Sequence, residues 1–234
     1  MIKEKRQKLI LDFVRGKEFV THEEIAENFH IPSTTLRRDI TDLDKQKKIK
    51  KVHGGVQEIK ETQLYEEALN KKLHQNIEAK KNIAKKALDC IKPNETIYLD
   101  SGSTTYFLAK ILPNDMNIKV YTNSIISAQE LFSNGFKEVY ILGGKIKDVT
   151  GAIVGAETVS QINTYNFDLA FIGINAMDAE GFLYTTNIEE AKIKETVIKN
   201  SYLCFGLIDT TKFNSKSFIK FSKKNTVTII SEVN

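Results

Sequence analysis

The stretch from Ser33 to Gly55 constrains this chain more than any other, because it joins a two-faced helix to a short basic segment. Apolar residues recur at Leu36, Ile40 and Leu43, a spacing that predicts a helix with one buried face. The opposite face is polar and basic, and the segment that follows is rich in lysine and ends in a His-Gly-Gly turn. A helix followed by a basic, β-prone hairpin is typical of a winged helix-turn-helix domain.

Two helices predicted upstream complete that domain. A first helix is expected over residues 3–14, and Thr21 to Glu24 is predicted to form a capping box that starts a second. A turn at residues 30–32 leads into the third helix, and this arrangement places the third helix in the major groove of DNA. The alternative is a solvated helix with a lysine-rich tail, because charge runs usually mark a solvated face. The two upstream helices favour DNA binding.

The excess positive charge of the chain lies at its amino-terminal end. Residues 1–60 hold 14 of the 34 Lys and Arg residues but only 10 of the 30 Asp and Glu residues, which leaves 20 of each for the remainder. The formal net charge of +4 therefore belongs to the amino-terminal quarter. This distribution is expected if that quarter contacts DNA phosphates and the rest does not.

Length and cysteine content narrow the class of protein. A chain of 234 residues is natural for two domains. Cys90 and Cys204 lie far apart with no His or Cys at metal-ligand spacing, which indicates reduced thiols, so we expect no metal and no cofactor. The amino terminus is too charged for a signal peptide, and no apolar stretch reaches membrane-spanning length. The sequence predicts a cytoplasmic protein with no membrane partner.

The sequence TLRRDITDLDKQKKIKKVHGG resembles the signature of the DeoR family of bacterial repressors, in which the third helix is followed by the wing. The chain departs from that signature at Pro32, which replaces a capping Ser, at Lys47, which replaces Gly, and at Lys51, which replaces Arg. Either Ser33 caps the helix one position later, or Pro32 is its first residue. The residues predicted to contact double-stranded operator DNA are Ser33, Thr34, Thr35, Arg37, Arg38, Lys50, Lys51 and His53.

The stretch from residue 57 to about residue 94 is rich in Lys, Glu and Ala and predicts a linker followed by a helix that packs on a second domain. A coiled-coil dimerisation arm is the alternative, but no heptad is sustained. We therefore expect a winged helix-turn-helix domain at 1–57, a linker at 58–75 and a second domain at 76–234.

From Thr96 onward, β-prone apolar runs alternate with helical segments. This alternation predicts an α/β domain with a mostly parallel sheet covered by helices, and ligands outside the carboxyl ends of the strands. A hairpin is predicted within residues 143–155. The predicted strands are 96–100, 118–122, 138–142, 168–174, 201–209 and 225–230, and the predicted helices are near 104–112, 124–134, 155–162 and 188–200.

Polar and glycine-rich segments follow the predicted strands and indicate one pocket. The first strand ends in Asp100-Ser101-Gly102-Ser103-Thr104-Thr105, directly before a helix. Backbone N–H groups and the positive end of a helix at such a turn suit a phosphate, although a simple helix cap would also use Ser or Thr. Later strand ends carry Asn123, Gly143-Gly144, Gly173-Ile174-Asn175 and Asp209 to Lys212.

The motifs LDSGSTT, TNS, LGG, FIGIN, GFLYTTNIEEAKIK and IDTTKF resemble the successive motifs of the DeoR-type sensor domain. That domain is similar in fold to ribose-5-phosphate isomerase and glucosamine-6-phosphate deaminase, and it binds phosphorylated sugars. The chain has Ala176 where the family has a second glycine, and an extra residue in GFLYTT. The resemblance implies a phosphate at Ser101, Gly102, Ser103, Thr104, Thr105 and Lys212, sugar hydroxyls at Asp100, Asn175, Glu190 and Lys194, and further effector contacts at Asn123 and Gly144.

One alternative for two of these residues is structural. Glu190 and Lys194 are spaced so that they could form an i,i+4 surface pair on a helix.

Two functions follow from these motifs. The first is a transcription factor that represses a sugar uptake or catabolism operon and is released from DNA by a phosphorylated sugar. The second is a sugar-phosphate isomerase or deaminase, because fold does not fix function. No His or paired carboxylate stands out as a base, so no catalytic residue is assigned and an enzyme is not expected.

The sequence also suggests the effector and the assembly. The similarity of GFLYTTNIEEAKIK to fructose- and lactose-operon members of the family suggests fructose 1-phosphate or tagatose 6-phosphate. A homodimer or homotetramer is expected, because symmetric operators are read by two-fold assemblies.

Overall fold

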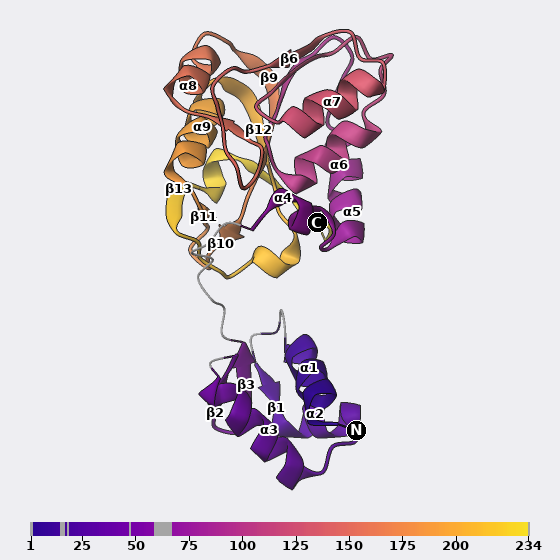
Figure 1. The fold of residues 1–234 in the computed structure, drawn as a ribbon, viewed down its shortest axis with the longest axis vertical. Helices are drawn as coiled ribbons and strands as arrows, with labels where there is room; N and C mark the ends of the chain where they lie inside the picture. The colour runs from indigo at the N-terminus through magenta and orange to yellow at the C-terminus, as the bar shows by residue number, and fades with distance from the viewer. Residues whose placement is uncertain (1, 15–16, 18, 47, 59–66, 234) are drawn as a thin grey trace. The chain divides into compact units, whose positions relative to one another are not determined.

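The structure is a computed structural model that describes residues 2–14, 17, 19–46, 48–58 and 67–233 (Figure 1). The chain divides into two compact units, Met1–Glu61 and Thr62–Asn234, and each is described by itself. Lys47 and most of the first half of the predicted linker lie outside the described residues.

The first unit is a winged helix-turn-helix domain, as the sequence predicts. Ten buried apolar residues, including Ile10, Ile25, Leu36 and Ile40, form one core beneath its three helices and its sheet. The sheet is antiparallel, with strand order β1-β3-β2. The elements are α1 (Lys3–Val14), β1 (Val20–Thr21), α2 (His22–Phe29), α3 (Ser33–Lys45), β2 (Ile49–Val52) and β3 (Gly55–Glu58).

The N-terminal ends of α2 and α3 are set by the residues that cap them. The predicted capping box of α2 is present, because the Glu24 amide donates to Thr21 Oγ1 at 3.1 Å and the Thr21 amide donates to Glu24 Oε2 at 2.7 Å. The start of α3 differs from both expectations, since Pro32 itself is the N-cap. The Pro32 carbonyl accepts from the amides of Thr35 at 3.0 Å and Leu36 at 2.9 Å, and proline has no side-chain oxygen with which to cap the helix.

A buried ion pair fixes α1 against α3. The carboxylate of Asp39, which is 2% exposed, accepts two hydrogen bonds from the Arg6 guanidinium, the second from Nη2 at 3.1 Å. Two parallel bonds of this kind give geometric specificity as well as energy. Asp39 therefore serves the domain's structure, and the exposed residues of α3 are left for DNA.

The second unit is built on a six-stranded sheet in which every neighbouring pair is parallel, with strand order β14-β12-β9-β4-β5-β6. All six strands predicted from the sequence are present. They are β4 (Thr96–Leu99), β5 (Lys119–Thr122), β6 (Val139–Ile141), β9 (Phe167–Gly173), β12 (Ser201–Leu207) and β14 (Thr228–Ile230).

Helices cover both faces of this sheet (Figure 1). Alternate residues of each strand enter different cores, so that Ile97 and Leu99 pack on one side and Tyr98 packs on the other. The four helices predicted in this part of the chain are all present. One side carries α5 (Ile77–Leu88), α6 (Ser103–Ile111) and α7 (Ile125–Ser133), and the other carries α8 (Ala156–Ile162) and α9 (Ile188–Lys199).

Two smaller sheets complete the unit. The predicted hairpin is β7 (Lys145–Ile146) paired with β8 (Ile153–Val154). A second, antiparallel sheet was not predicted, and its strand order is β10-β11-β13. Its strands are β10 (Ala176–Met177), β11 (Phe182–Thr185) and β13 (Ile219–Lys223), and two short 3₁₀ turns, η1 (Thr210–Lys212) and η2 (Lys224–Thr226), follow β12 and β13.

A short helix, α4 (Leu69–Leu73), lies within the span predicted as linker. It contacts α6, and the Leu69 amide donates to the Val149 carbonyl at 3.3 Å. This part of the predicted linker is therefore packed on the second unit.

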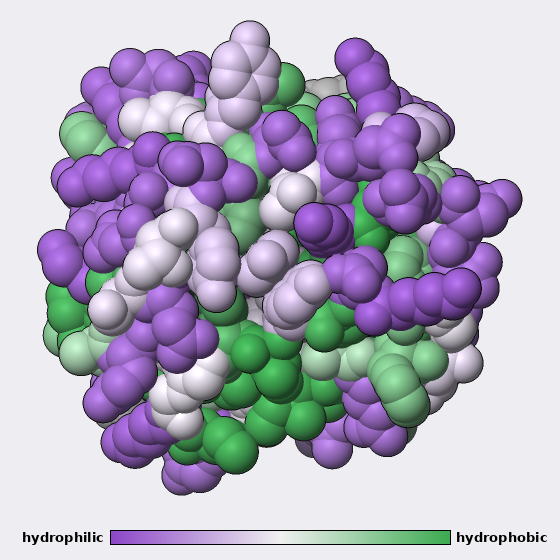
Figure 2. Space-filling model, turned by 90° about the horizontal axis from the view of Figure 1, so that it is seen from above, coloured by the Kyte–Doolittle hydropathy of each residue, from purple (hydrophilic) through white to green (hydrophobic). Residues whose placement is uncertain are grey.

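The described surface is mostly polar, with some large apolar side chains exposed. Figure 2 shows a face on which hydrophilic residues predominate and hydrophobic residues gather in one area. Among the described residues, six large apolar side chains are more than 60% exposed, namely Ile2, Phe132, Ile188, Tyr202, Phe218 and Val233. The helices of the described ranges include none that is long and apolar enough to cross a membrane.

Candidate functional site

The first candidate site is the exposed face of α3 together with the wing formed by β2, β3 and their turn. Thr35 is half-buried, and the other seven residues predicted to contact DNA are exposed, namely Ser33, Thr34, Arg37, Arg38, Lys50, Lys51 and His53. Asp44 Oδ1 accepts from the Lys51 amide at 2.8 Å and so ties the wing to the end of α3. The face combines cations for phosphates with shorter polar groups for base edges.

His22 adds a titratable group beside this face that the sequence analysis did not select. Burial lowers the pKa of His22 below its ordinary value, Glu23 opposes this shift, and the positive charges of Lys51 and Arg37 lower the pKa further. His22 of α2 therefore lies close enough to Arg37 of α3 and Lys51 of the wing to be affected by their positive charges.

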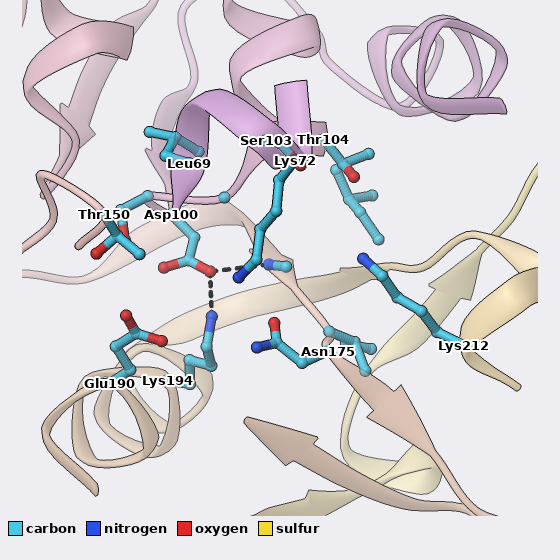
Figure 3. Close-up of a pocket in the computed structure, with 15 residues that line it drawn as sticks. Leu69, Lys72, Asp100, Ser103, Thr104, Thr150, Asn175, Glu190, Lys194 and Lys212 are labelled. Carbon is cyan, nitrogen blue, oxygen red and sulfur yellow. Dashed lines mark hydrogen bonds and ion pairs between the residues drawn. The ribbon is translucent and has the colours of Figure 1, made fainter. Parts of the chain in front are cut away.

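The second candidate site is a cavity of about 40 Å³ at the carboxyl edge of the six-stranded sheet (Figure 3). Strand exits, α4, α6 and α9 all contribute to its wall. Nine of the twelve predicted effector residues line it: Asp100, Ser101, Gly102, Ser103, Thr104, Asn175, Glu190, Lys194 and Lys212.

The turn between β4 and α6 presents a helix start to this cavity. Thr105 Oγ1 accepts from the Gly102 amide at 3.0 Å and donates to the Asp100 carbonyl at 2.6 Å, so the turn is held from inside. A Cβ on Gly102 would lie 3.7 Å from Gly173 Cα, which shows how closely the two strand exits approach. The first turn of α6 thus meets the cavity with N–H groups that have no partner within the helix.

Asp100 and Lys194 form a buried ion pair across the cavity wall. Both are at most 4% exposed, and Asp100 Oδ2 accepts from Lys194 Nζ and from the Gly173 amide, the latter at 2.9 Å (Figure 3). These bonds tie the ends of β4 and β9 to α9. Much of the hydrogen-bonding capacity of this carboxylate is therefore used within the protein.

Glu190 is also paired within the protein. Its Oε1 accepts from Lys147 Nζ at 3.1 Å, and its Oε2 accepts from Thr185 Oγ1 at 3.1 Å. Glu190 and Lys194 are both buried and have different partners, so the i,i+4 surface pair is wrong.

Lys212 lies on η1 and pairs with Asp209 at 3.3 Å. Burial raises the pKa of Asp209, but Lys212, the Thr211 hydroxyl and Lys80 outweigh this effect and bring the pKa below its ordinary value. An adjoining cavity of about 200 Å³ is lined by Lys212, Asp209, Asn175 and Lys80, among others. Asn175 Nδ2 is buried and has no hydrogen-bond acceptor among the described residues, so it is a donor available to a ligand.

Three predicted effector residues do not line the cavity. Thr105 is fully buried within the turn that it holds. Asn123 accepts from the Tyr98 hydroxyl at 2.8 Å and donates to the Ile153 carbonyl at 3.0 Å. Gly144 has φ +149°, and a Cβ there would meet Thr158 Oγ1 at 2.3 Å, so glycine is required by space.

The sequence analysis missed several wall residues, of which Lys72 of α4 is the most informative, because it brings a cation into the wall. Nothing in its local sequence separates Lys72 from the other lysines of a polar stretch. Lys147 reaches the site through Glu190 and was missed for the same reason. The other missed wall residues are Leu69, Thr150 and Leu207, whereas Gly173 and Ile174 belong to a strand exit that the sequence analysis assigned to the pocket.

A winged helix-turn-helix unit joined to a helix-covered parallel sheet with a polar cavity defines a DNA-binding transcriptional regulator. Family models make the class specific: a DeoR-like helix-turn-helix domain matches residues 6–62, and a DeoR C-terminal sensor domain matches residues 75–232. The chain belongs to the DeoR family of transcriptional regulators.

Curated relatives agree with this assignment. An uncharacterized HTH-type transcriptional regulator, FruR of Bacillus subtilis, is 32% identical over 98% of this chain and 91% of its own length. The glycerol-3-phosphate regulon repressor of Escherichia coli is 28% identical over 90% and 82%, and the L-fucose operon activator of the same organism is 30% identical over 98% and 94%. These relatives are named as regulators and not as enzymes.

One solved structure shows the fold, and a second has a weaker similarity to this chain. A translation initiation factor eIF-2B from Pyrococcus horikoshii OT3 is 12% identical, and the match covers 100% of this chain and 83% of that one with a TM-score of 0.53. A ribose 5-phosphate isomerase from Methanocaldococcus jannaschii is 18% identical over 59% and 55%, with a TM-score of 0.44.

Proposed function

We propose that this regulator represses a sugar uptake or catabolism operon and leaves its operator when a phosphorylated sugar occupies the cavity at the sheet edge. One observation carries the proposal. The N-terminal N–H groups of α6, which suit an anion, share the cavity with Lys212 and with Asn175 Nδ2, which has no acceptor among the described residues. On the DNA side, Thr35 and Arg37 contact base edges, while Arg38 and the wing lysines contact phosphates.

Release follows from linkage between the two binding events. An effector that binds the DNA-incompetent arrangement more tightly lowers operator affinity by the same factor. A coupling free energy of about 1–3 kcal/mol corresponds to roughly a 5–150-fold change in operator affinity, which is enough for regulation. The family includes an activator as well as repressors, so the sign of regulation is part of the proposal.

The effector that we propose is a ketohexose phosphate, with fructose 1-phosphate and tagatose 6-phosphate as the candidates. The phosphate lies at Ser101 to Thr104 beside Lys212, and the hydroxyl groups lie toward Asn175, Glu190 and Lys194. A homodimer or homotetramer would present two winged domains to a symmetric operator. Sedimentation of the full chain as a monomer at micromolar concentration would contradict the assembly.

The test is titration calorimetry with both sugar phosphates and with free fructose, alongside a DNA-shift assay. Wild type should bind a sugar phosphate and not the free sugar. Charge-assisted hydrogen bonds contribute roughly 1.5–3 kcal/mol, so Lys212→Ala should weaken effector binding about ten- to a hundredfold. The control is Lys223→Ala, because Lys223 is exposed on β13 and does not line the cavity. Equal binding of free and phosphorylated sugar would contradict the proposal.

A further inference from the structure

The two adjoining cavities at the sheet edge share part of their walls. The shared lining residues are Lys72, Ser103, Asn175 and Lys212. The first cavity, of about 40 Å³, is much smaller than the adjoining cavity of about 200 Å³. We therefore expect a hexose phosphate to span both cavities and to lie against the four residues that they share.

Lys72 and Lys212 are the two shared residues whose long side chains can reach a phosphate in either cavity. Ser103 lies in the first turn of α6, and Asn175 has a short side chain between β9 and β10. Lys72 has a long side chain that extends from α4 into the cavity (Figure 3). Its ammonium group is also a cation that can meet the same phosphate as Lys212.

The buried side chain of Lys80, on α5, holds the backbone of α4. Lys80 is 2% exposed. Lys80 Nζ donates to the carbonyl of Lys72 and, at 2.6 Å, to the carbonyl of Gln75. Asn76, which directly precedes α5, donates to Asp209 Oδ1 and to Thr211 Oγ1, both at 3.2 Å. The segment that carries Lys72 is thus hydrogen bonded to Asp209 and Thr211, which line the larger cavity.

Burying an ammonium group has a large solvation cost, and an apolar side chain at the same place would avoid it. Burial lowers the pKa of Lys80 to about 8, Lys212 and Lys72 lower it, and Asp209 and Glu67 raise it. A lysine here is therefore better explained by the two carbonyl groups that it holds than by packing.

We infer that Lys72 is a ligand of the effector phosphate and that Lys80 is the positioning residue that holds α4 over the site. When the effector binds, Lys72 turns onto the phosphate while Lys80 holds the backbone of α4 at the site, so that occupancy of the site is coupled to α4. In chain order, α4 is the first described helix after the DNA-binding unit, so the coupling acts on the segment that follows that unit. This inference rests on the proposed function.

The first test separates Lys72 from its neighbour. Lys72→Met should weaken binding of fructose 1-phosphate or tagatose 6-phosphate at least tenfold in calorimetry. Lys71→Met is the matched control, because Lys71 lies on the same helix, is exposed and pairs only with Glu67 among the interactions described. Unchanged affinity in Lys72→Met would overturn the role of Lys72.

The second test separates positioning from stability. Lys80→Met should bind the sugar phosphate within about threefold of wild type, yet saturating effector should no longer release it from operator DNA. Hydrogen exchange of the amides at residues 69–76 should be faster without any ligand. Lys85→Met is the control, because Lys85 is exposed on the same helix. A lower unfolding temperature with normal release and normal exchange would show that Lys80 is merely structural and would overturn the inference.

The two tests also separate this inference from the proposed function. If wild type binds neither sugar phosphate, the proposed function fails, and the ligand role of Lys72 fails with it. If wild type is released by effector and Lys72→Met and Lys80→Met behave like wild type, the inference alone fails.

Discussion

The DNA-binding face and the effector cavity are built in opposite ways. The DNA-binding face comes from one continuous stretch, residues 33–53, and most of its charged side chains are exposed. The cavity is assembled from segments as distant as Leu69 and Lys212, and its charges are largely buried and paired. An exposed cation is ready to meet a polyanion, whereas a buried pair fixes the shape of a site.

This contrast has a consequence for mutations. Removing an exposed cation should change binding and leave the fold intact, because exposed charges contribute little to stability. Removing one partner of a pair in which both charges are buried, as in Asp100 and Lys194, should destabilise the fold, because the other charge stays in a place where water cannot solvate it.

The strongest test of the contrast is Lys194→Met. It leaves the Asp100 carboxylate buried without its cation, so the unfolding free energy of the second unit should fall by about 3–5 kcal/mol. Denaturant unfolding measures the loss. The matched control is Lys192→Met on the same helix, because Lys192 is 68% exposed in its pair with Glu195. The control should change stability by less than about 0.5 kcal/mol. Equal effects of the two variants would remove the distinction between buried and exposed charges.

The fold was predictable where the signal was local. Runs of four to seven apolar, β-prone residues predicted all six strands of the parallel sheet, and the capping box of Thr21 and Glu24 predicted the start of α2. The small sheet β10-β11-β13 was missed, because its strands are short and its partners are distant, as with Phe182 opposite Lys223.

The site was predictable only in part, for a related reason. Strand exits identified most of the wall, since carboxyl ends of parallel strands meet at one edge. The pairing of Asp100 with Lys194, 94 residues later, has no signal in either local sequence. Thr105 and Asn123 are of residue types that often bind ligands. Their side chains instead donate hydrogen bonds to backbone carbonyl groups of the protein, those of Asp100 and Ile153.

A second test uses pH to examine a buried charge directly. The pKa of Lys80 in the folded chain is about 8, below the ordinary 10.5, so the folded state binds fewer protons between these values. Lys80 should therefore contribute a rise in the unfolding free energy from pH about 8 to 10.5, of at most about 3.5 kcal/mol at roughly 1.4 kcal/mol per unit, and the difference between wild type and Lys80→Met measures this contribution. Lys80→Met should lack this rise, and Lys85→Met should keep it. A rise of the same size in Lys80→Met would assign it to another group.

A third test concerns base readout by the exposed face. Arg37→Ala should weaken operator binding by about 1–3 kcal/mol and relax the preference for one base pair, because bidentate arginine contacts discriminate bases by that amount. The unfolding free energy should not change, since Arg37 is exposed. Binding to operators with single base-pair changes measures the specificity. A uniform loss across all DNA sequences would show that Arg37 contacts phosphate instead.

The smallest effect per residue is expected at the wing. Lys50 and Lys51 are exposed on β2, and each is proposed to contact one phosphate. Neutralising a phosphate releases counterions, so the logarithm of affinity falls with the logarithm of salt by about 0.9 per contact. Lys50→Ala with Lys51→Ala should therefore reduce the salt slope by about two and weaken binding to all sequences alike. The control is Lys45→Ala with Lys48→Ala, which removes two exposed lysines that precede the wing and are not predicted to contact DNA. If both double variants lower the salt slope equally, the lysines of this segment contribute only through their total charge, and the wing has no defined phosphate contacts.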